Sequence, residues 1–243
     1  HRAALAIHMP RSRLQLALVS GLVLATGWTV GVCKFSQVLM TSSGGKFETA
    51  SEQIAESFLI TFGLAKATGN LIVGGAADAH GRRVCMVVGW LAAAAMAALV
   101  VAATTWSLVV AADALLGLQQ AFCWSTAIFV AVDLLGPARR GVAVGLVETL
   151  GYTAVATAGP LVSAYGQPGG AWRLYAAILG LALVCAAASG CGLQESRELA
   201  RREEAAQQAQ QQQAQQQQAQ QQQAAAAAAA ADEKPGAGAA GAR

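Results

Sequence analysis

A short charged connection between two long apolar stretches constrains this chain more than any other feature. The connection is Gly-Gly-Ala-Ala-Asp-Ala-His-Gly-Arg-Arg, residues 74–83. On each side lie about 20 mostly apolar residues, enough to cross a bilayer as a helix. So short a connection makes the two spans antiparallel neighbours. Arg82 and Arg83 begin the second span, so we expect this end to face the cytoplasm. Asp78 is expected where the first helix ends, and Gly81 at a residue with positive φ.

The composition agrees with a membrane protein. Of the 243 residues, 55% are hydrophobic and only 12% are charged, which is unusual for a soluble domain. The net charge of +3 is small, and the arginines lie beside apolar segments. That placement indicates membrane topology and not a nucleic-acid surface. We therefore expect the lipid bilayer as a partner and no nucleic acid.

The apolar stretches predict an all-α membrane protein with six transmembrane helices. A cytoplasmic segment, residues 1–13, should precede a bundle over residues 14–193. The expected spans are residues 14–39, 57–77, 84–103, 107–132, 142–165 and 172–193.

Basic residues between these spans predict the orientation. Ten arginines fall on one side, whereas only Lys46 and Arg173 fall on the other. This bias places both ends of the chain in the cytoplasm. The ten are Arg2, Arg11, Arg13, Arg82, Arg83, Arg139, Arg140, Arg197, Arg201 and Arg202.

The last part of the chain, residues 194–243, has a different character. Residues 207–223 are glutamine broken by single alanines, and residues 224–231 are pure alanine. Such a segment has no apolar face and cannot build a core, although both residue types favour helix. We interpret it as a cytoplasmic linker, with a polyglutamine interaction tract as the alternative. Because the sequence begins with His1, we expect a fragment of something longer.

Two charges in the outer half of the expected spans are candidates for a transport site. A charge inside a span costs about 2.5–3.5 kcal/mol on insertion scales, so each needs a physical reason. Lys66 and Asp113 lie about 13 Å and about 9 Å from the outer side, at 1.5 Å per residue. A Lys66–Asp113 pair would keep both charged beside a central cavity. The alternatives are a structural pair, or Asp113 reaching the outer water.

Glu148 is the strongest candidate for a substrate or proton site. It lies about 10 Å into the fifth span from the inner side, with no basic residue expected at matching depth. A lone carboxyl group in apolar surroundings exchanges protons more readily near neutral pH. Gln120 lies at a similar depth in the fourth span. The alternative is a structural carboxyl held by hydrogen bonds. Weaker candidates for the same cavity are Asn70, Thr68 and Trp124.

The sequence lacks the motifs that carry known enzyme chemistry. It has no zinc-binding His-Glu-x-x-His, no Gly-x-Ser-x-Gly, no phosphate-binding loop and no Cys/His cluster. We therefore expect neither an enzyme nor a bound metal or cofactor.

The connection resembles the signature loop between the second and third helices of the major facilitator superfamily. The position after the aspartate, usually basic in that family, is Ala79 here. A chance turn between two apolar helices is the alternative. The matching residues are Gly74, Asp78, Gly81, Arg82 and Arg83.

The resemblance covers residues 14–198 and implies the amino-terminal half of a transporter. It implies six helices arranged as two inverted three-helix repeats, with the signature loop acting as a gate. It also implies secondary transport of a small-molecule solute, with the missing carboxy-terminal half as partner. Glu148 leads us to expect that this transport is proton-coupled. The competing hypothesis is a transporter-like sensor or scaffold that signals through the glutamine-rich tail.

Overall fold

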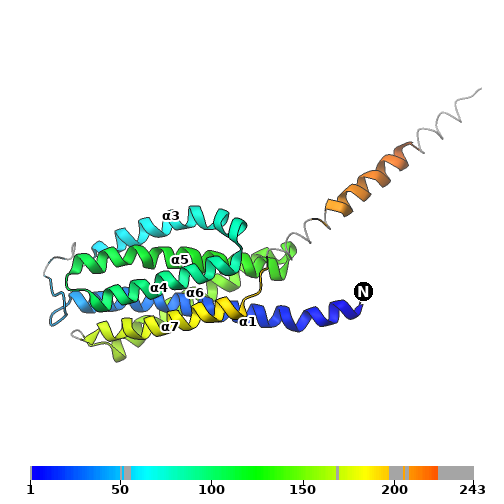
Figure 1. Ribbon diagram of the computed structural model, residues 1–243. Coiled ribbons are helices and arrows are strands. Elements are labelled where there is room, and N and C mark those ends of the chain that lie inside the picture. The colour runs from blue at the N-terminus through cyan, green and yellow to red at the C-terminus, as the bar shows by residue number, and fades with distance from the viewer. Residues whose placement is uncertain are drawn as a thin grey trace, which may run out of the picture. The chain divides into compact units, whose positions relative to one another are not determined.

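The computed structural model describes residues 2–49, 51, 56–167, 170–196, 205 and 208–223, with side chains from residue 13 onward. Over these ranges the chain is helical and contains no strand. The helices are α1 (Arg2–Thr41), α3 (Ser57–His80), α4 (Arg82–Ala102), α5 (Trp106–Leu135), α6 (Arg140–Tyr165) and α7 (Trp172–Gly192), with a short 3₁₀ helix, η1 (Pro137–Arg139) (Figure 1). Residues 208–223 form a further helix in a separate compact unit.

Six of the described helices are long and apolar enough to cross a membrane. In α1 this part begins at Arg13 and ends at Thr41. Each expected span coincides with one helix, so the prediction of an all-helical membrane protein is confirmed. The expected pairing of the helices into inverted repeats stays a prediction.

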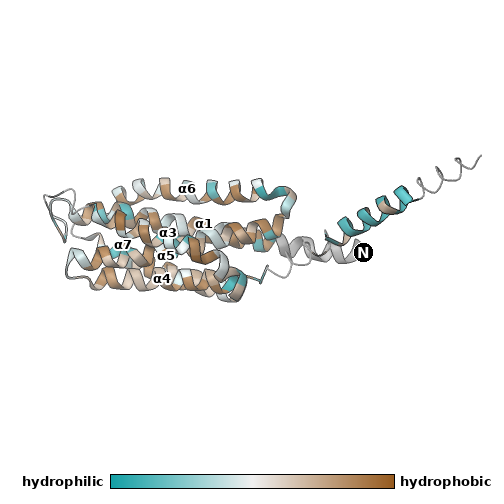
Figure 2. Cartoon of the chain, turned by 90° about the horizontal axis from the view of Figure 1, so that it is seen from above, coloured by the Kyte–Doolittle hydropathy of each residue, from teal (hydrophilic) through white to brown (hydrophobic). Residues whose placement is uncertain are grey.

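Helix α5 is the centre of the bundle, because it packs against α1, α3, α4 and α6. Helix α1 also packs against α6 and α7, and α4 packs against α7. Hydrophobic residues make up much of each helix in the bundle (Figure 2). Many large apolar side chains are exposed, including Leu71 and Leu64 of α3 and Val184 of α7. A surface of this kind suits lipid and would be a large exposed apolar patch in water.

Small residues let α1 and α6 approach closely. A Cβ atom added at Gly27 would overlap the carbonyl oxygen of Gly151 and the side chain of Ala154. One turn further along, a Cβ at Gly31 would meet Ala158. Close approach at small residues is a common way for membrane helices to associate, since lipid provides no hydrophobic drive between them.

The contact between α3 and α5 follows the same rule. A Cβ at Gly117 of α5 would overlap the carbonyl oxygen of Phe62 and crowd the backbone nitrogen of Lys66. Gly69 of α3 packs equally closely on Ala121. The backbone of Lys66 therefore lies directly against the middle of α5.

Two glycines with positive φ form the short connections. Gly81 alone separates α3 from α4, at φ 96°, as the sequence predicts. Gly136, at φ 78°, ends α5, and Pro137 follows it. The expected span over residues 107–132 ended too early, because the helix continues through Asp133 to Leu135 until this Gly-Pro pair breaks it. Asp78 likewise lies inside α3, which continues to His80.

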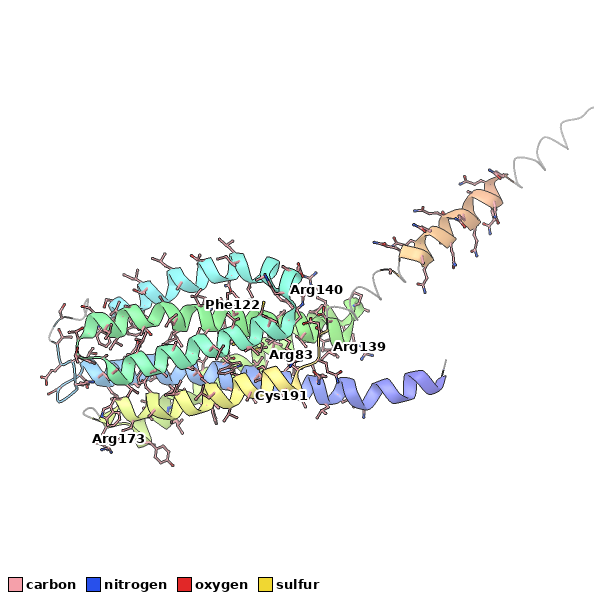
Figure 3. The ribbon with its side chains drawn as sticks, in the orientation of Figure 1. Arg83, Phe122, Arg139, Arg140, Arg173 and Cys191 are labelled. Carbon is pink, nitrogen blue, oxygen red and sulfur yellow. The ribbon has the colours of Figure 1, made fainter. Side chains whose placement is uncertain are left out.

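Four described arginines gather where α3 joins α4 and α5 joins α6. We call this the arginine end and define it by Arg82, Arg83, Arg139 and Arg140. Figure 3 shows the last three at one end of the bundle and Arg173 at the other. Arg197, Arg201 and Arg202 lie outside the described residues, as do residues 224–231 of the tail.

Candidate functional site

At the arginine end, Arg82 joins three helices. Its Nη1 lies 2.7 Å from Oδ1 of Asp78, one turn earlier across the α3–α4 connection. Its Nε lies 3.5 Å from Oδ2 of Asp133, in the last turn of α5. The guanidinium carbon lies 5.1 Å from the ring centroid of Phe129. One cation thus neutralises two carboxylates from different helices and packs on an aromatic face.

The segment after α7 is attached to the same place. The carboxylate of Glu195 accepts hydrogen bonds from the backbone N–H groups of Arg82 and Arg83, at 3.0 and 3.3 Å. These donors belong to the first turn of α4, where no helical acceptor exists for them. Ser196 donates to Oδ2 of Asp133 at 2.6 Å. The chain leaving α7 therefore caps α4 and supports α5.

The structure brings together only part of the proposed gating motif. Asp78 and Arg82 form the ion pair, and Gly81 provides the turn between them. Arg83 contributes a backbone N–H, while Gly74 has open space around it.

Three members of this cluster were missed from the sequence: Asp133, Glu195 and Ser196. The available signal was the presence of carboxylates beside the arginines of one membrane side. A motif search restricted to the connection itself could not detect them.

In the half of the bundle away from the arginine end, Asp113 is fully buried against α1. The amide nitrogen of Gln37 donates to both carboxylate oxygens, at 2.8 and 2.9 Å. The expected Lys66–Asp113 pair was wrong, because Gln37 occupies the carboxylate. The alternative that Asp113 reaches water was wrong as well. An amide inside the first span was the overlooked signal.

Two lysines lie in the same region, since Lys34 is within electrostatic range of Asp113 and the Lys66 backbone packs on Gly117, one turn away along α5. Lys34 of α1 places its ammonium 4.4 Å from the ring centroid of Phe62 on α3. Lys66 is half-buried, and its ammonium makes no hydrogen bond or ion pair with any described residue. The two lysines lie close enough for their charges to interact, and Asp113 lies within the same range of Lys34.

Glu148 is half-buried and held by the indole of Trp124. The Trp124 Nε1–H donates to Oε1 of Glu148 at 2.9 Å. The indole ring covers Gly151, where a Cβ would overlap three ring atoms, and meets the ring of Tyr152 edge-on at 5.2 Å. No basic residue was expected at the depth of Glu148, and that stays a prediction. Lys66, nearer the middle of its helix, lies within electrostatic range of the carboxylate.

The remaining polar candidates also lie near the middle of the bundle. Gln120 is buried, and its amide oxygen has no hydrogen-bond partner among the described residues. Asn70 accepts a hydrogen bond from Ser125 at 3.3 Å, linking α3 to α5. Thr68 donates to the carbonyl of Leu64 in its own helix. Of these three, only Gln120 offers a buried group without a partner.

We compared the chain, with its six apolar helices and its charged connection at Gly81, with known protein families. Residues 15–231 match the family described as Major Facilitator Superfamily. The chain belongs to the major facilitator superfamily. The family consists of transporters and not enzymes, so this chain is a multi-pass membrane protein of a transporter family. No match was found among curated proteins.

For a chain of the major facilitator superfamily, the geometry separates two sets of charges. One set, at the arginine end, is closely paired between helices and the segment after α7. The other set, Lys66 and Glu148, lies within the spans and is not closely paired. Across the part of the chain that the structure describes, no three His, Cys, Asp or Glu side chains gather to hold a metal.

Proposed function

We propose that the chain is the amino-terminal half of a proton-coupled secondary transporter for a small-molecule solute. In this proposal the six helices form two inverted three-helix repeats, and a second six-helix half faces them across the substrate site. The observation that carries it is the presence of half-buried Lys66 and Glu148 within spans, without a close ionic partner. Uncompensated charges in a membrane are costly and usually mark a transport pathway.

Glu148 is the proposed proton or substrate group, with Asp113, Lys66 and Gln120 as the other members of the site. Support comes from its position. The carboxylate is partly exposed, fixed by Trp124 and within range of a lysine charge that a proton or solute would change. Asp113 is the second acidic candidate and is fully enclosed beside Gln37.

The corner around Arg82 is the proposed gate. Its ion pairs connect α3, α4 and α5, so their breakage would free these ends to move relative to one another. The arginines at this end also support a cytoplasmic location of both chain ends. Cysteines introduced at Ser43 and Gln167 should react with an impermeant reagent from outside, and one at Ala138 only after permeabilisation. The reverse pattern would refute the orientation.

Uptake by the full-length protein in liposomes tests the function. A proton gradient should drive accumulation of its solute, and collapse of the gradient should abolish it. The 243-residue chain alone should not accumulate solute, because its polar face would meet lipid. Absence of any uptake or exchange by the full-length protein would instead favour the sensor hypothesis, in which the glutamine-rich tail transmits a signal.

A further inference from the structure

We propose that Lys66, Gln120, Trp124, Glu148 and Tyr152 form a binding site for a zwitterionic small molecule. The anionic group of the solute meets Lys66, and its cationic group meets Glu148 and Tyr152. The inference rests on the transport function proposed above, since it names the class of solute carried.

The two charges of the site are held apart by the helices that carry them. Lys66 lies 14 residues from the His80 end of α3, and Glu148 lies 8 residues from the Arg140 end of α6, an axial offset of about 9 Å at 1.5 Å per residue. They lie within electrostatic range but form no ion pair. A molecule with one charge of each sign, a few bonds apart, fits between them and satisfies both.

The cationic group of the solute would bind at Glu148. Trp124 fixes the carboxylate through Oε1, and the other oxygen has no partner among the described residues. Tyr152 follows four residues later on the same face of α6, with its side chain 59% exposed. A carboxylate beside an exposed aromatic ring is a favourable environment for an alkylammonium or quaternary ammonium group.

Gly151 makes this arrangement possible. It lies between Glu148 and Tyr152 in sequence, and the indole of Trp124 covers it. A side chain at this position would displace the ring and, with it, the hydrogen bond to Glu148.

The anionic group of the solute would bind at Lys66. Lys34 also carries positive charge at this level, but its ammonium lies over the Phe62 ring. The Lys66 ammonium lies over no aromatic ring of the described residues. Because Lys34 lies within range of Lys66, it strengthens the local attraction for an anion.

Gln120 lies between the two ends of the site along α5. It follows Gly117, which packs on the Lys66 backbone, by three residues and precedes Trp124 by four. Its buried amide oxygen lacks a partner among the described residues, and a rotation of the side chain toward the solute would let it accept a hydrogen bond from a solute N–H. A solute with a single charge would leave either Lys66 or Glu148 uncompensated in a low-dielectric setting, which disfavours it.

The test measures binding to the full-length protein in nanodiscs by calorimetry, with two matched series of probes. The first is glycine betaine, choline and 3,3-dimethylbutyrate; the second is phenylalanine, phenethylamine and 3-phenylpropionate. Each series contains a zwitterion, a cation and an anion of similar shape. The zwitterion of at least one series should bind at least tenfold tighter than both of its single-charge relatives. If neither zwitterion shows this preference, the proposal is wrong.

Two substitutions should change the preference in opposite directions. Lys66→Gln should weaken binding of the zwitterion at least tenfold, so that the cation binds as tightly as the zwitterion or more tightly. Glu148→Gln should weaken binding of the zwitterion by a similar factor, so that the anion binds as tightly or more tightly. Glu56→Gln and Arg173→Gln are the controls, because both positions are exposed near the end of the bundle that lies away from the arginine end. Neither should change the affinity for any of the three probes. Equal losses for all three probes in both variants would overturn the proposal.

Failure of the site and failure of the transport function give different results. A protein that accumulates solute but prefers a single-charge probe refutes the site and leaves transport in place. A protein that binds the zwitterion with the reciprocal switch, yet neither accumulates nor exchanges it, supports the site and refutes transport.

Discussion

The arginine end and the middle of the bundle handle charge in opposite ways. At the arginine end, Arg82 lies between two carboxylates, and Glu195 and Ser196 supply further hydrogen bonds. In the middle, Lys66 and Glu148 lie on different helices without touching. Both regions use charged side chains at helix contacts. Only the first is electrostatically complete within the described residues.

We infer from this difference that the arginine end holds the helices together, whereas the charges in the middle of the bundle bind a ligand. Groups that satisfy one another contribute to the cohesion of the helices, and removal of one partner leaves the others uncompensated. Charged groups that are held apart remain uncompensated, and a proton, a solute or a second protein half can neutralise or pair with them. The variants that follow break one region at a time.

Arg82→Gln should give the largest effect. It removes the cation that serves Asp78 and Asp133. The Asp78 side chain is mostly exposed, whereas Asp133 is buried, and breaking a buried charge pair costs about 3–5 kcal/mol when full desolvation applies. The Arg82 side chain is mostly buried, so we expect transport by the full-length protein to fall at least tenfold. Initial rates of uptake in liposomes, normalised to inserted protein, measure this.

Arg140→Gln is the matched control, since this arginine is exposed at the same end of the bundle. It should retain near-normal rates. Asp78→Asn should also abolish or bias transport while insertion into the membrane persists. Normal uptake in both Arg82→Gln and Asp78→Asn would show that the connection is only a turn.

Glu148→Gln tests the middle of the bundle. The amide retains an acceptor for Trp124 but cannot carry a proton, so accumulation driven by a proton gradient should fall at least tenfold. Exchange at saturating solute should persist, because the gate at the arginine end is untouched. Uptake and counterflow in the same liposomes distinguish these steps. Unchanged pH-dependent accumulation would reduce Glu148 to a structural acceptor and leave Asp113 as the acidic candidate.

Gly151→Ala sharpens the comparison without changing any charge. A Cβ at this position would overlap the Trp124 ring, and overpacking of this kind costs about 1–3 kcal/mol. We expect a lower midpoint of thermal unfolding and weaker solute binding, because the indole that holds Glu148 must move.

The control lies in the same helix. Gly145 has open space around its Cα, so Gly145→Ala should be neutral or stabilising by up to about 1 kcal/mol. Equal effects at the two glycines would argue against a role for the Trp124 indole in holding Glu148.

The helices were predictable from the sequence because long apolar stretches have few alternatives in a membrane. Their ends were less so. The positive φ of Gly81 was expected, whereas the continuation of α5 through Asp133 depends on where Gly136 and Pro137 break the helix. Local composition suggested a loop there because charged residues cluster around the break.

The partners of the charged side chains were the least predictable part. Depth along each helix suggested that Lys66 and Asp113 could meet, but depth says nothing about the direction in which a helix face points. Packing of α1 on α5 placed Gln37 against Asp113 instead. The Glu195 contacts likewise depend on the return of the chain after α7 to the start of α4. These two contacts join residues 76 and 113 positions apart, which sequence spacing cannot reveal.

Ser196→Ala should give the smallest effect and tests how complete the arginine end is. The Ser196 hydroxyl donates to Oδ2 of Asp133 at 2.6 Å, the same oxygen that lies 3.5 Å from Arg82. Hydrogen bonds to charged groups contribute about 1.5–3 kcal/mol, but here Arg82 remains to compensate the carboxylate, so we expect a loss near the lower limit. The unfolding midpoint should fall by a few degrees, with uptake nearly unchanged. In an Arg82→Gln background the same substitution should cost more, because Ser196 is then the only described hydrogen-bond donor left to Asp133. Equal costs in the two backgrounds would mean that the two donors act independently, and that this corner is a set of separate contacts with no shared role in holding the helices together.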